Sequence, residues 1–260
     1  MTLEARSLRA GYDRKDIIAN LDFSPSLGKF TVMSGSNGSG KSTLLSALSR
    51  MLMPSSGVVM LDGASIHRMP SREVAKKMGF LPQGLSELQD ISVLELVSCG
   101  RYPHKRFLSS WLDEDEKAVA ESLEMVNAVD LSEMSMSQLS GGQRQRCWIA
   151  MLLAQGASTM LLDEPTTFLD LRYQIEIVSL LRKLCQEYGR TIVAVLHDLN
   201  MASQYADELV FLKEGSIFAS GDISRVFTPS TIESVFGWPV RVFNDELTGR
   251  PYFLPFYDES

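Results

Sequence analysis

A glycine-rich loop between an apolar segment and a helical pattern constrains this chain more than any other feature. The run Gly35–Ser42 reads Gly-Ser-Asn-Gly-Ser-Gly-Lys-Ser and fits G-x-x-x-x-G-K-[ST] at every fixed position. It follows the apolar segment 30–33 and precedes residues 43–52, where leucines recur at every fourth position, as in a helix. Inward-turned backbone N–H groups and the positive end of a helix predict a polyphosphate site here. In such a loop Lys41 reaches the β- and γ-phosphates, and the Ser42 hydroxyl ligates Mg²⁺.

Two acidic side chains follow a second apolar segment. Residues 158–162 are uncharged and typical of a buried strand, and Asp163 and Glu164 come directly after them. Parallel α/β sheets place functional groups at the carboxyl ends of their strands, so we expect both carboxylates near the phosphate loop. There Asp163 can hold the Mg²⁺ shell, and Glu164 can orient and deprotonate an attacking water.

Other polar residues have equivalent positions. His197 follows the apolar segment 191–196, where a contact to a γ-phosphate is geometrically available, and Gln83 follows the apolar segment 78–82. The run Leu139–Gln143, Leu-Ser-Gly-Gly-Gln, opens a helical pattern. It forms a second glycine-rich helix N-terminus, which can face phosphate.

Together these motifs resemble the ATP-binding subunits of ABC transporters over nearly the whole chain. The Leu-Ser-Gly-Gly-Gln run is close to exclusive to that superfamily. Finer features resemble the importers of ferric siderophores, haem and vitamin B12, and among these three they favour iron–siderophore import. The finer resemblance is carried by residues 93–97, Gly100–His104, 141–150, Thr166–Asp170 and 197–200.

The resemblance implies an assembly as well as an activity. ATP and Mg²⁺ are the expected cofactors, and two copies of the chain are expected to pair head to tail. Each ATP would lie between Gly35–Ser42 of one copy and Ser140–Gln143 of the other. The pair would dock on two integral membrane permease subunits at the cytoplasmic face of the bacterial inner membrane. An external substrate-binding protein would serve the assembly, and no nucleic acid is expected.

The resemblance also assigns roles to single residues. It implies that Glu164 is the catalytic base, that His197 and Gln83 sense the γ-phosphate, and that Gln83 joins Ser42 and Asp163 around Mg²⁺. Tyr12 is expected to stack on adenine, with a packed turn tyrosine as the alternative. The other residues expected to contact the nucleotide are Gly35, Ser36, Asn37, Gly38, Ser39, Gly40, Lys41, Ser42, Thr43, Ser140, Gly141, Gly142, Gln143 and Asp170.

The expected fold is α/β: a P-loop NTPase core with an N-terminal antiparallel β subdomain and an inserted helical subdomain. Residues 1–82 and 151–226 are expected to form the core, 83–150 the helical subdomain and 227–260 a C-terminal extension of strands or a helix packed on the core. The acidic run 113–116 resembles a metal cluster. The spacing of Asp113 and Glu116 fits a capping box, however, so we expect a helix start there instead.

Composition excludes several functions. The net charge of −7 argues against a nucleic-acid footprint, which is normally basic. Three scattered cysteines without a C-x-x-C pair predict neither a disulfide framework nor a zinc site, and they suit a reducing cytosol. The N-terminus has no apolar signal region. The longest uncharged run, 147–162, is too short and polar to span a bilayer. We therefore expect the transport pathway to be formed by other chains.

Four alternative functions share part of this motif set. A DNA-repair or chromosome-organising ATPase needs a long coiled-coil insertion between Gln83 and Leu139, and that segment is short and lacks a heptad pattern. A translation factor of the same superfamily would carry two motif sets, and a small-molecule P-loop kinase would lack Leu139–Gln143. An exporter ATPase stays open, although exporters more often fuse the ATPase to membrane helices. Haem and vitamin B12 also stay open as alternative cargoes.

Overall fold

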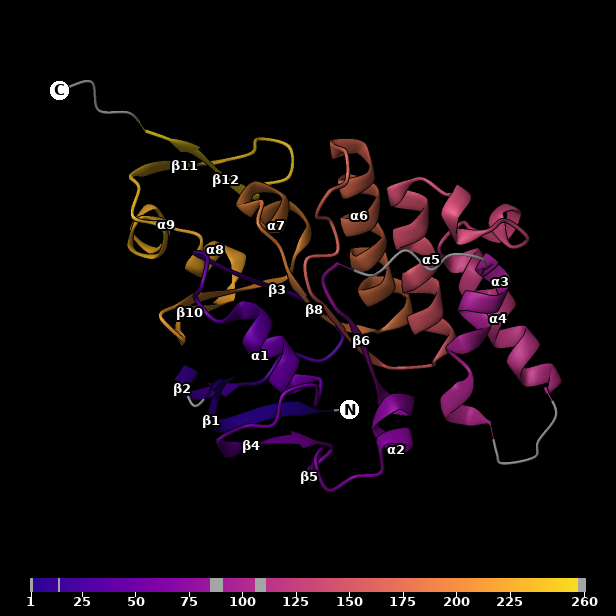
Figure 1. Cartoon of the computed structure of the whole chain (residues 1–260). Coiled ribbons are helices and arrows are strands. Elements are labelled where there is room, and N and C mark those ends of the chain that lie inside the picture. Colours follow the sequence, from indigo (N-terminus) through magenta and orange to yellow (C-terminus); the bar gives the residue numbers. More distant parts are fainter. Residues whose placement is uncertain (1, 14, 85–90, 106–110, 257–260) are drawn as a thin grey trace.

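The computed structural model describes residues 2–13, 15–84, 91–105 and 111–256. Figure 1 shows a central sheet, an antiparallel sheet below it, and a group of helices to the right. This arrangement confirms the expected α/β fold with an antiparallel β part and a helical part.

The central sheet has six strands in the order β10-β9-β3-β8-β7-β6. Neighbouring strands from β9 to β6 are parallel, and β10 pairs antiparallel with β9 at the edge. The sequence segments expected to be strands before the polar motifs are confirmed. The strands are β3 (Phe30–Gly35), β6 (Met78–Leu81), β7 (Thr159–Leu162), β8 (Thr191–Val195), β9 (Glu208–Lys213) and β10 (Ser216–Asp222).

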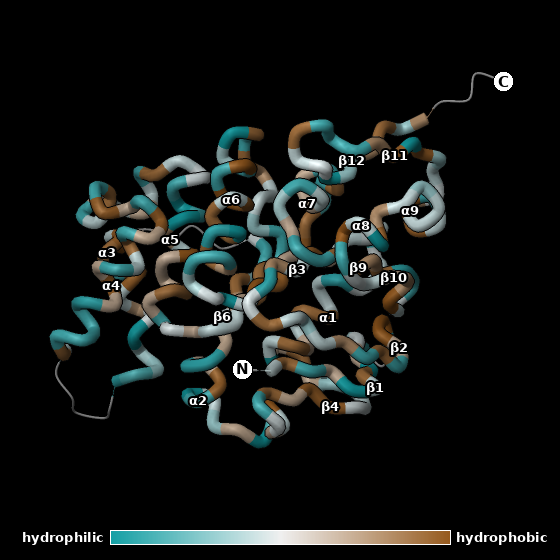
Figure 2. Tube along the Cα trace, turned by 180° about the vertical axis from the view of Figure 1, so that it is seen from behind, coloured by the Kyte–Doolittle hydropathy of each residue, from teal (hydrophilic) through white to brown (hydrophobic). Residues whose placement is uncertain are grey.

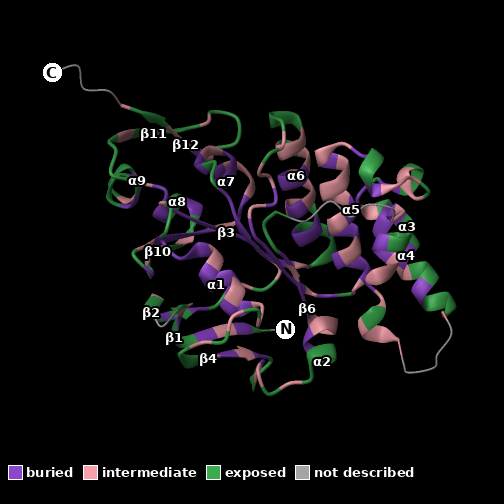
Figure 3. Cartoon of the chain, in the orientation of Figure 1, coloured by how far each residue is buried: buried purple, intermediate pink, exposed green. Residues whose placement is uncertain are grey.

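The inner strands of this sheet are covered on both faces, so β3, β7 and β8 are buried at every position. Along β3, Val32 packs into one core and Met33 into the other, because successive side chains of a strand point to opposite faces. Helices α6 (Leu171–Tyr188) and α7 (Leu199–Tyr205) pack on the Val32 side, and α1 (Lys41–Leu48) packs on the Met33 side. Figure 3 shows the central strands as buried.

The antiparallel sheet has the order β2-β1-β4-β5. Its strands are β1 (Leu3–Tyr12), β2 (Lys15–Phe23), β4 (Ser56–Leu61) and β5 (Ala64–Ser65). Helix α1 lies between the two sheets, since its leucines share one core with both. The helix ends at Leu48, so the expected helical spacing is wrong for Leu52. Arg50 adopts a left-handed conformation with φ of 70°, which ends the helix before Leu52 is reached.

The helical part lies beyond β6. Its elements are α3 (Val93–Cys99), α4 (Asp113–Met125) and α5 (Gly141–Ala154), with 3₁₀ turns η1 (Tyr102–His104), η2 (Val129–Leu131) and η3 (Met136–Gln138), and α2 (Ser71–Lys77) leads into β6. The expected capping box between Asp113 and Glu116 is wrong. The N-cap is Leu112, one residue earlier, and its N–H donates to the carboxylate of Asp115 at 3.3 Å. The acidic residues do lie in the first turn of α4, as expected from the helix dipole.

The chain ends in α8 (Ile223–Val226), α9 (Pro229–Phe236) and a hairpin of β11 (Val240–Asn244) and β12 (Pro251–Pro255). The tail was expected to form strands or a helix packed on the core, and it forms both. In Figures 1 and 2 the hairpin lies beside α7, at the opposite end of the molecule from α3 and α4. None of the helices in the described ranges is long and apolar enough to cross a membrane.

Candidate active site

The glycine-rich loop Gly35–Ser42 joins β3 to α1 and encloses the Lys41 side chain. The Lys41 ammonium donates hydrogen bonds to the carbonyl oxygens of Gly35 and Ser36, at 3.0 Å each, and lies 3.5 Å from Ser39 Oγ. Burial lowers the pKa of Lys41, although two nearby carboxylates oppose that shift. A buried cation held only by neutral oxygens can exchange them for phosphate oxygens, because charge-assisted hydrogen bonds are stronger.

The shape of the loop depends on two of its glycines. A Cβ at Gly40, where φ is 102°, would lie 2.7 Å from Ile18 Cδ1. A Cβ at Gly35 would lie 2.2 Å from the carbonyl oxygen of Leu212 on β9. The backbone of β9 therefore leaves no space for a side chain at Gly35, and the positive φ disfavours any residue other than glycine at position 40. Of the other loop residues, Asn37 and Gly38 are exposed, whereas Ser39 and Thr43 are buried.

Ser42 and Asp163 meet where α1 begins and β7 ends. The Ser42 hydroxyl donates to Asp163 Oδ1 at 3.1 Å, and Asp163 is only 7 % exposed. Burial raises the pKa of Asp163, against the lowering effect of the Ser42 hydrogen bond. A buried carboxylate beside a hydroxyl forms the hard oxygen pair that suits Mg²⁺. Within the described ranges no group of three or more His, Cys, Asp or Glu side chains is gathered for a metal. Phosphate and water would have to complete the shell, as is usual for Mg²⁺.

Two of the other predicted residues, Gln83 and His197, contact Glu164. Gln83, from the end of β6, donates its Nε2 to Glu164 Oε2 at 2.7 Å. His197, from the end of β8, places Nε2 at 2.6 Å from Glu164 Oε1. Three strand ends thus deliver three side chains to one place, as the parallel sheet requires. The Gln83 side chain reaches Glu164 here, rather than the Ser42–Asp163 pair.

Thr167 also contacts Glu164, and sequence reasoning did not assign it to the site. Its hydroxyl donates to Glu164 Oε2 at 2.9 Å, and its N–H donates to the Glu164 carbonyl at 3.2 Å. Glu164 itself has a φ of 53°, which turns the chain sharply after β7. The available signal was the three-residue spacing of Glu164 and Thr167 in a turn, which is typical of hydroxyl side chains that bond within a turn.

The Ser140–Gln143 run lies at the start of α5, in the helical part. Ser140 is the N-cap: its hydroxyl accepts from Gln143 N at 3.3 Å, and Gln143 Oε1 accepts from Ser140 N at 2.8 Å. A Cβ at Gly142 would lie 2.5 Å from the Tyr173 ring, so this glycine is needed for α5 to pack on α6. Gly141 lines a pocket of about 230 Å³ together with Glu164. In the described part of the chain, Ser140–Gln143 makes no hydrogen bond to the glycine-rich loop.

Two further predicted residues lie apart from the Glu164 cluster. Tyr12 ends β1 and is half exposed. Asp170 is an exposed N-cap of α6, and its side chain makes no capping bond. The neighbouring Phe168 has a φ of 63° and is 95 % exposed.

A large groove lies on the helical part, away from the Glu164 cluster. Its volume is about 910 Å³, and its walls come from α3, α4 and the segments that follow them. Leu94, Ser98 and Tyr102 line one wall, and Val119 and Leu123 line the other.

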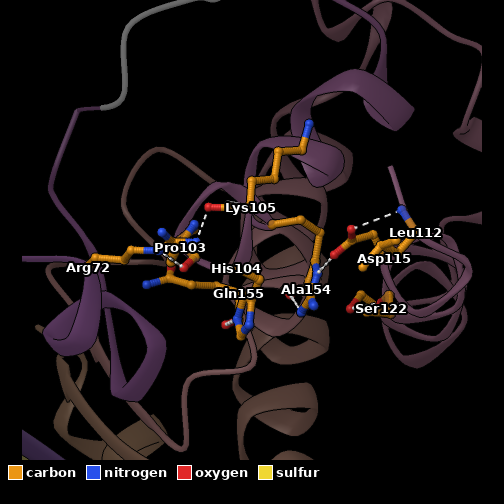
Figure 4. Close-up of polar contacts among 11 residues, drawn as sticks. Arg72, Pro103, His104, Lys105, Leu112, Asp115, Ser122, Ala154 and Gln155 are labelled. Atoms are coloured by element: carbon orange, nitrogen blue, oxygen red, sulfur yellow. Dashed lines mark hydrogen bonds and ion pairs between the residues drawn. The ribbon is translucent and has the colours of Figure 1, made fainter. Parts of the chain in front are cut away.

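Polar contacts fix residues 101–105, which follow α3, beside this groove (Figure 4). Arg101 Nε lies 2.8 Å from Asp115 Oδ1, and Arg101 Nη1 donates to the carbonyl of Ala154 at 2.8 Å. Burial would raise the pKa of Asp115, but hydrogen bonds from Arg101 and Leu112 hold it below its usual value. A buried ion pair of this kind resists separation, because either partner alone would be an uncompensated charge.

The same segment is tied to the core. His104 Nε2 lies 2.9 Å from the carbonyl oxygen of Gln155, and Arg72 of α2 donates to the carbonyl oxygens of Pro103 and Lys105 (Figure 4). The Gln155 amide donates to the carbonyl oxygen of Met78, at the start of β6. Hydrogen bonds therefore link one side of the groove to β6, the strand that precedes Gln83.

Curated proteins resemble the chain over nearly its full length. The probable siderophore transport system ATP-binding protein YusV of Bacillus subtilis is 45 % identical over 253 residues, which is 97 % of this chain and 92 % of that protein. The ferric enterobactin transport ATP-binding protein FepC of Escherichia coli is 44 % identical over 253 residues, which is 97 % of this chain and 93 % of that protein.

Solved structures share the fold. A transporter described as of the metal-chelate ABC type, in an inward-facing conformation, matches with a TM-score of 0.84 and 28 % identity over 98 % of both chains. A dimeric post-hydrolysis state of the ATP-binding cassette MJ0796, bound to ADP and Pi, matches with a TM-score of 0.72 and 28 % identity over 85 % of this chain and 98 % of that one. The family model for ABC transporters matches residues 18–167. The chain therefore belongs to the ABC transporter family, as one of its ATP-binding subunits.

Proposed function

We propose that this chain hydrolyses MgATP to power the uptake of an iron–siderophore complex through partner membrane subunits. The observation that carries the hydrolysis is the convergence of Gln83, Thr167 and His197 on Glu164, in the same site as the Lys41 loop. The cargo is supported by the names of the two relatives, which act in siderophore and ferric enterobactin transport.

Binding of the triphosphate follows from the loop. Lys41 would release the carbonyl oxygens of Gly35 and Ser36 and turn its charge to the β- and γ-phosphates. Ser42 and Asp163 would hold Mg²⁺, which would neutralise charge developing on the phosphates. Both Lys41 and Asp163 are buried, so their electrostatic effect on a phosphate is screened less than it would be at the surface.

Hydrolysis would depend on Glu164. Its carboxylate is aimed by three side chains, and a positioned carboxylate can take the proton of an attacking water. His197 is half exposed beside it and can contact the γ-phosphate. Gln83 contacts the base directly and precedes the helical part, so it can report the nucleotide state to a partner. Most of the catalytic effect would be positioning and electrostatics, as in other phosphoryl transfers.

A second copy of the chain would complete each site. Ser140–Gln143 is a helix N-terminus suited to phosphate, yet it makes no hydrogen bond to the glycine-rich loop of its own chain. A head-to-tail pair would bring it onto the nucleotide of the partner copy. The exposed aromatic ring of Phe168 and the exposed Asp170 would lie at that interface, and Tyr12 would stack on adenine. The dimeric form of MJ0796 supports this arrangement.

The membrane partners would dock at the groove between α3 and α4. The pair would then lie at the cytoplasmic face of the inner membrane, with an external binding protein delivering cargo from the other side. The division into a core of residues 1–82 and 151–226, a helical subdomain of 83–150 and an extension of 227–260 remains our prediction. The net charge of −7 gives no reason to expect nucleic acid.

Deleting the gene tests the cargo. The deletion strain should fail to grow with a ferric siderophore as the sole iron source, and a wild-type copy should restore growth, whereas a Glu164→Gln copy should not. Loss of haem or cobalamin uptake with normal siderophore growth would assign one of these alternative cargoes. If no uptake of any chelate changes, the importer assignment fails, and the exporter alternative becomes the better account.

A further inference from the structure

Asn200 of α7 pairs with the backbone of β12 in the C-terminal hairpin. Asn200 Nδ2 donates to the Phe253 carbonyl oxygen at 3.1 Å, and Phe253 N donates to Asn200 Oδ1 at 2.8 Å. The amide of Asn200 therefore meets the backbone of β12 with one donor and one acceptor, as a neighbouring strand would. Figure 1 shows the hairpin against α7.

The hairpin also holds the other end of α7. The Ser203 hydroxyl, which is fully buried, donates to the Pro251 carbonyl oxygen at 2.6 Å. Arg250 Nη1 donates to the carbonyl oxygens of Ser203 and Ala206, at 2.8 Å each. These carbonyls belong to the C-terminal end of α7, where a helix has unsatisfied acceptors. The hairpin thus contacts α7 from its first turn to its end.

The position of α7 bears on His197. Asp198 is the N-cap of α7, and its carboxylate accepts from Met201 N at 2.8 Å, which fixes the residue directly after His197 to the first turn. The His197 side chain is 50 % exposed, and its contact is with Glu164. Because little packing surrounds the ring, its location depends on the backbone that enters α7. A movement of α7 therefore moves the ring relative to Glu164.

We propose that Asn200, held by β12, is a positioning residue that keeps His197 at Glu164 and at the γ-phosphate. The hairpin thereby has a role in hydrolysis from outside the phosphate loop and the Glu164 cluster. The proposal rests on the proposed ATPase activity. Misplacement of a reacting group by about 1 Å can cost roughly a hundredfold in rate, so the loss of a side-chain anchor three residues from His197 is large enough to measure.

The test is steady-state ATP hydrolysis by purified Asn200→Ala. We expect kcat to fall about 10- to 100-fold, while KM for ATP stays within about twofold, since the phosphate loop is untouched. The matched control is Asn244→Ala, an exposed asparagine on β11 of the same hairpin, which should keep the wild-type kcat. The decisive comparison repeats Asn200→Ala in a His197→Ala background, where it should cause no further loss.

Three results would overturn the proposal. One is a wild-type kcat in Asn200→Ala. Another is an equal loss of kcat in the wild-type and His197→Ala backgrounds, which would place the effect elsewhere. If Asn200→Ala does not fold, Asn200→Asp replaces it, because the carboxylate still accepts the hydrogen bond from Phe253 N but no longer donates one. The third result is that neither variant folds, which would assign the Asn200–Phe253 pair to stability alone. If the wild-type protein hydrolyses no ATP, the proposed function fails, and that result is distinct from these three.

Discussion

Replacing Glu164 with glutamine removes the proposed base and changes little else. Glutamine has nearly the same shape, so one end of its amide can still accept the hydrogen bond that Gln83 and Thr167 offer, while the other meets His197. Loss of a positioned general base typically lowers a rate by 10²- to 10⁴-fold. That range corresponds to about 2.7–5.4 kcal/mol of transition-state stabilisation, at about 1.36 kcal/mol for each factor of ten.

Two assays separate hydrolysis from binding in Glu164→Gln. Phosphate release should fall by that factor, whereas the affinity for a fluorescent ATP analogue should stay within about threefold, and size-exclusion chromatography with MgATP should show an accumulated dimer. Glu187→Gln is the matched control, because Glu187 is exposed and forms only a long ion pair with Lys183, at 3.8 Å. Normal turnover in Glu164→Gln, or loss of nucleotide binding, would show that Glu164 has another role.

Three more predictions address separate parts of the account. Lys41→Ala should abolish tight ATP binding, measured by equilibrium titration. The control Lys117→Ala, at an exposed position, should bind ATP as the wild type does. Wild-type ATPase activity in Lys41→Ala would refute the phosphate-loop assignment. Burial raises the pKa of Asp163 above its unfolded value, so its contribution to stability is present at low pH and is lost as pH rises through the folded pKa. Asp163→Asn should therefore raise the melting temperature of the nucleotide-free protein at pH 7 while reducing Mg²⁺-dependent hydrolysis. The control Asp130→Asn, at an exposed position, should do neither. A lower melting temperature in Asp163→Asn would contradict the burial argument. A cysteine introduced at Ser98, in a Cys99→Ser background, should crosslink to the membrane partner, because Ser98 and Cys99 both line the groove. The two cysteines that remain, Cys147 and Cys185, are buried. Crosslinking is also expected from cysteines at Leu85 and Ser86, which lie outside the described residues. Crosslinking only from Ser224→Cys, in the C-terminal part, would place docking elsewhere.

The location of Gln83, Glu164 and His197 at strand ends could be predicted because the signals are local, whereas their roles remain predictions. Each of Gln83, Glu164 and His197 directly follows a short apolar segment, and the rule that parallel strands present their ends at one edge is enough to bring them together. The same reasoning placed Ser42 near Asp163, which the structure shows in hydrogen-bond contact.

Errors occurred where neighbours in space decide the outcome. The leucine spacing predicts a helix that reaches Leu52, but Arg50 has a left-handed backbone conformation, and α1 ends before it. The spacing of the acidic residues predicts a capping box at Asp113. In the structure, however, Asp115 forms an ion pair with Arg101, and the spacing of the acidic residues cannot reveal that partner. The contact between Asn200 and Phe253 joins residues far apart in the chain and uses the backbone of one of them, so no sequence pattern marks it.

The most direct test of the central claim is ATP-driven cargo uptake in proteoliposomes. They would contain the wild-type chain with the two membrane subunits and the external binding protein that we propose as its partners, and radiolabelled ferric siderophore outside. Uptake should require MgATP on the side of this chain, and it should be lost when the chain carries Glu164→Gln, although that variant still binds ATP. Equal uptake without ATP, or with Glu164→Gln in both copies, would contradict the claim that hydrolysis at Glu164 drives import.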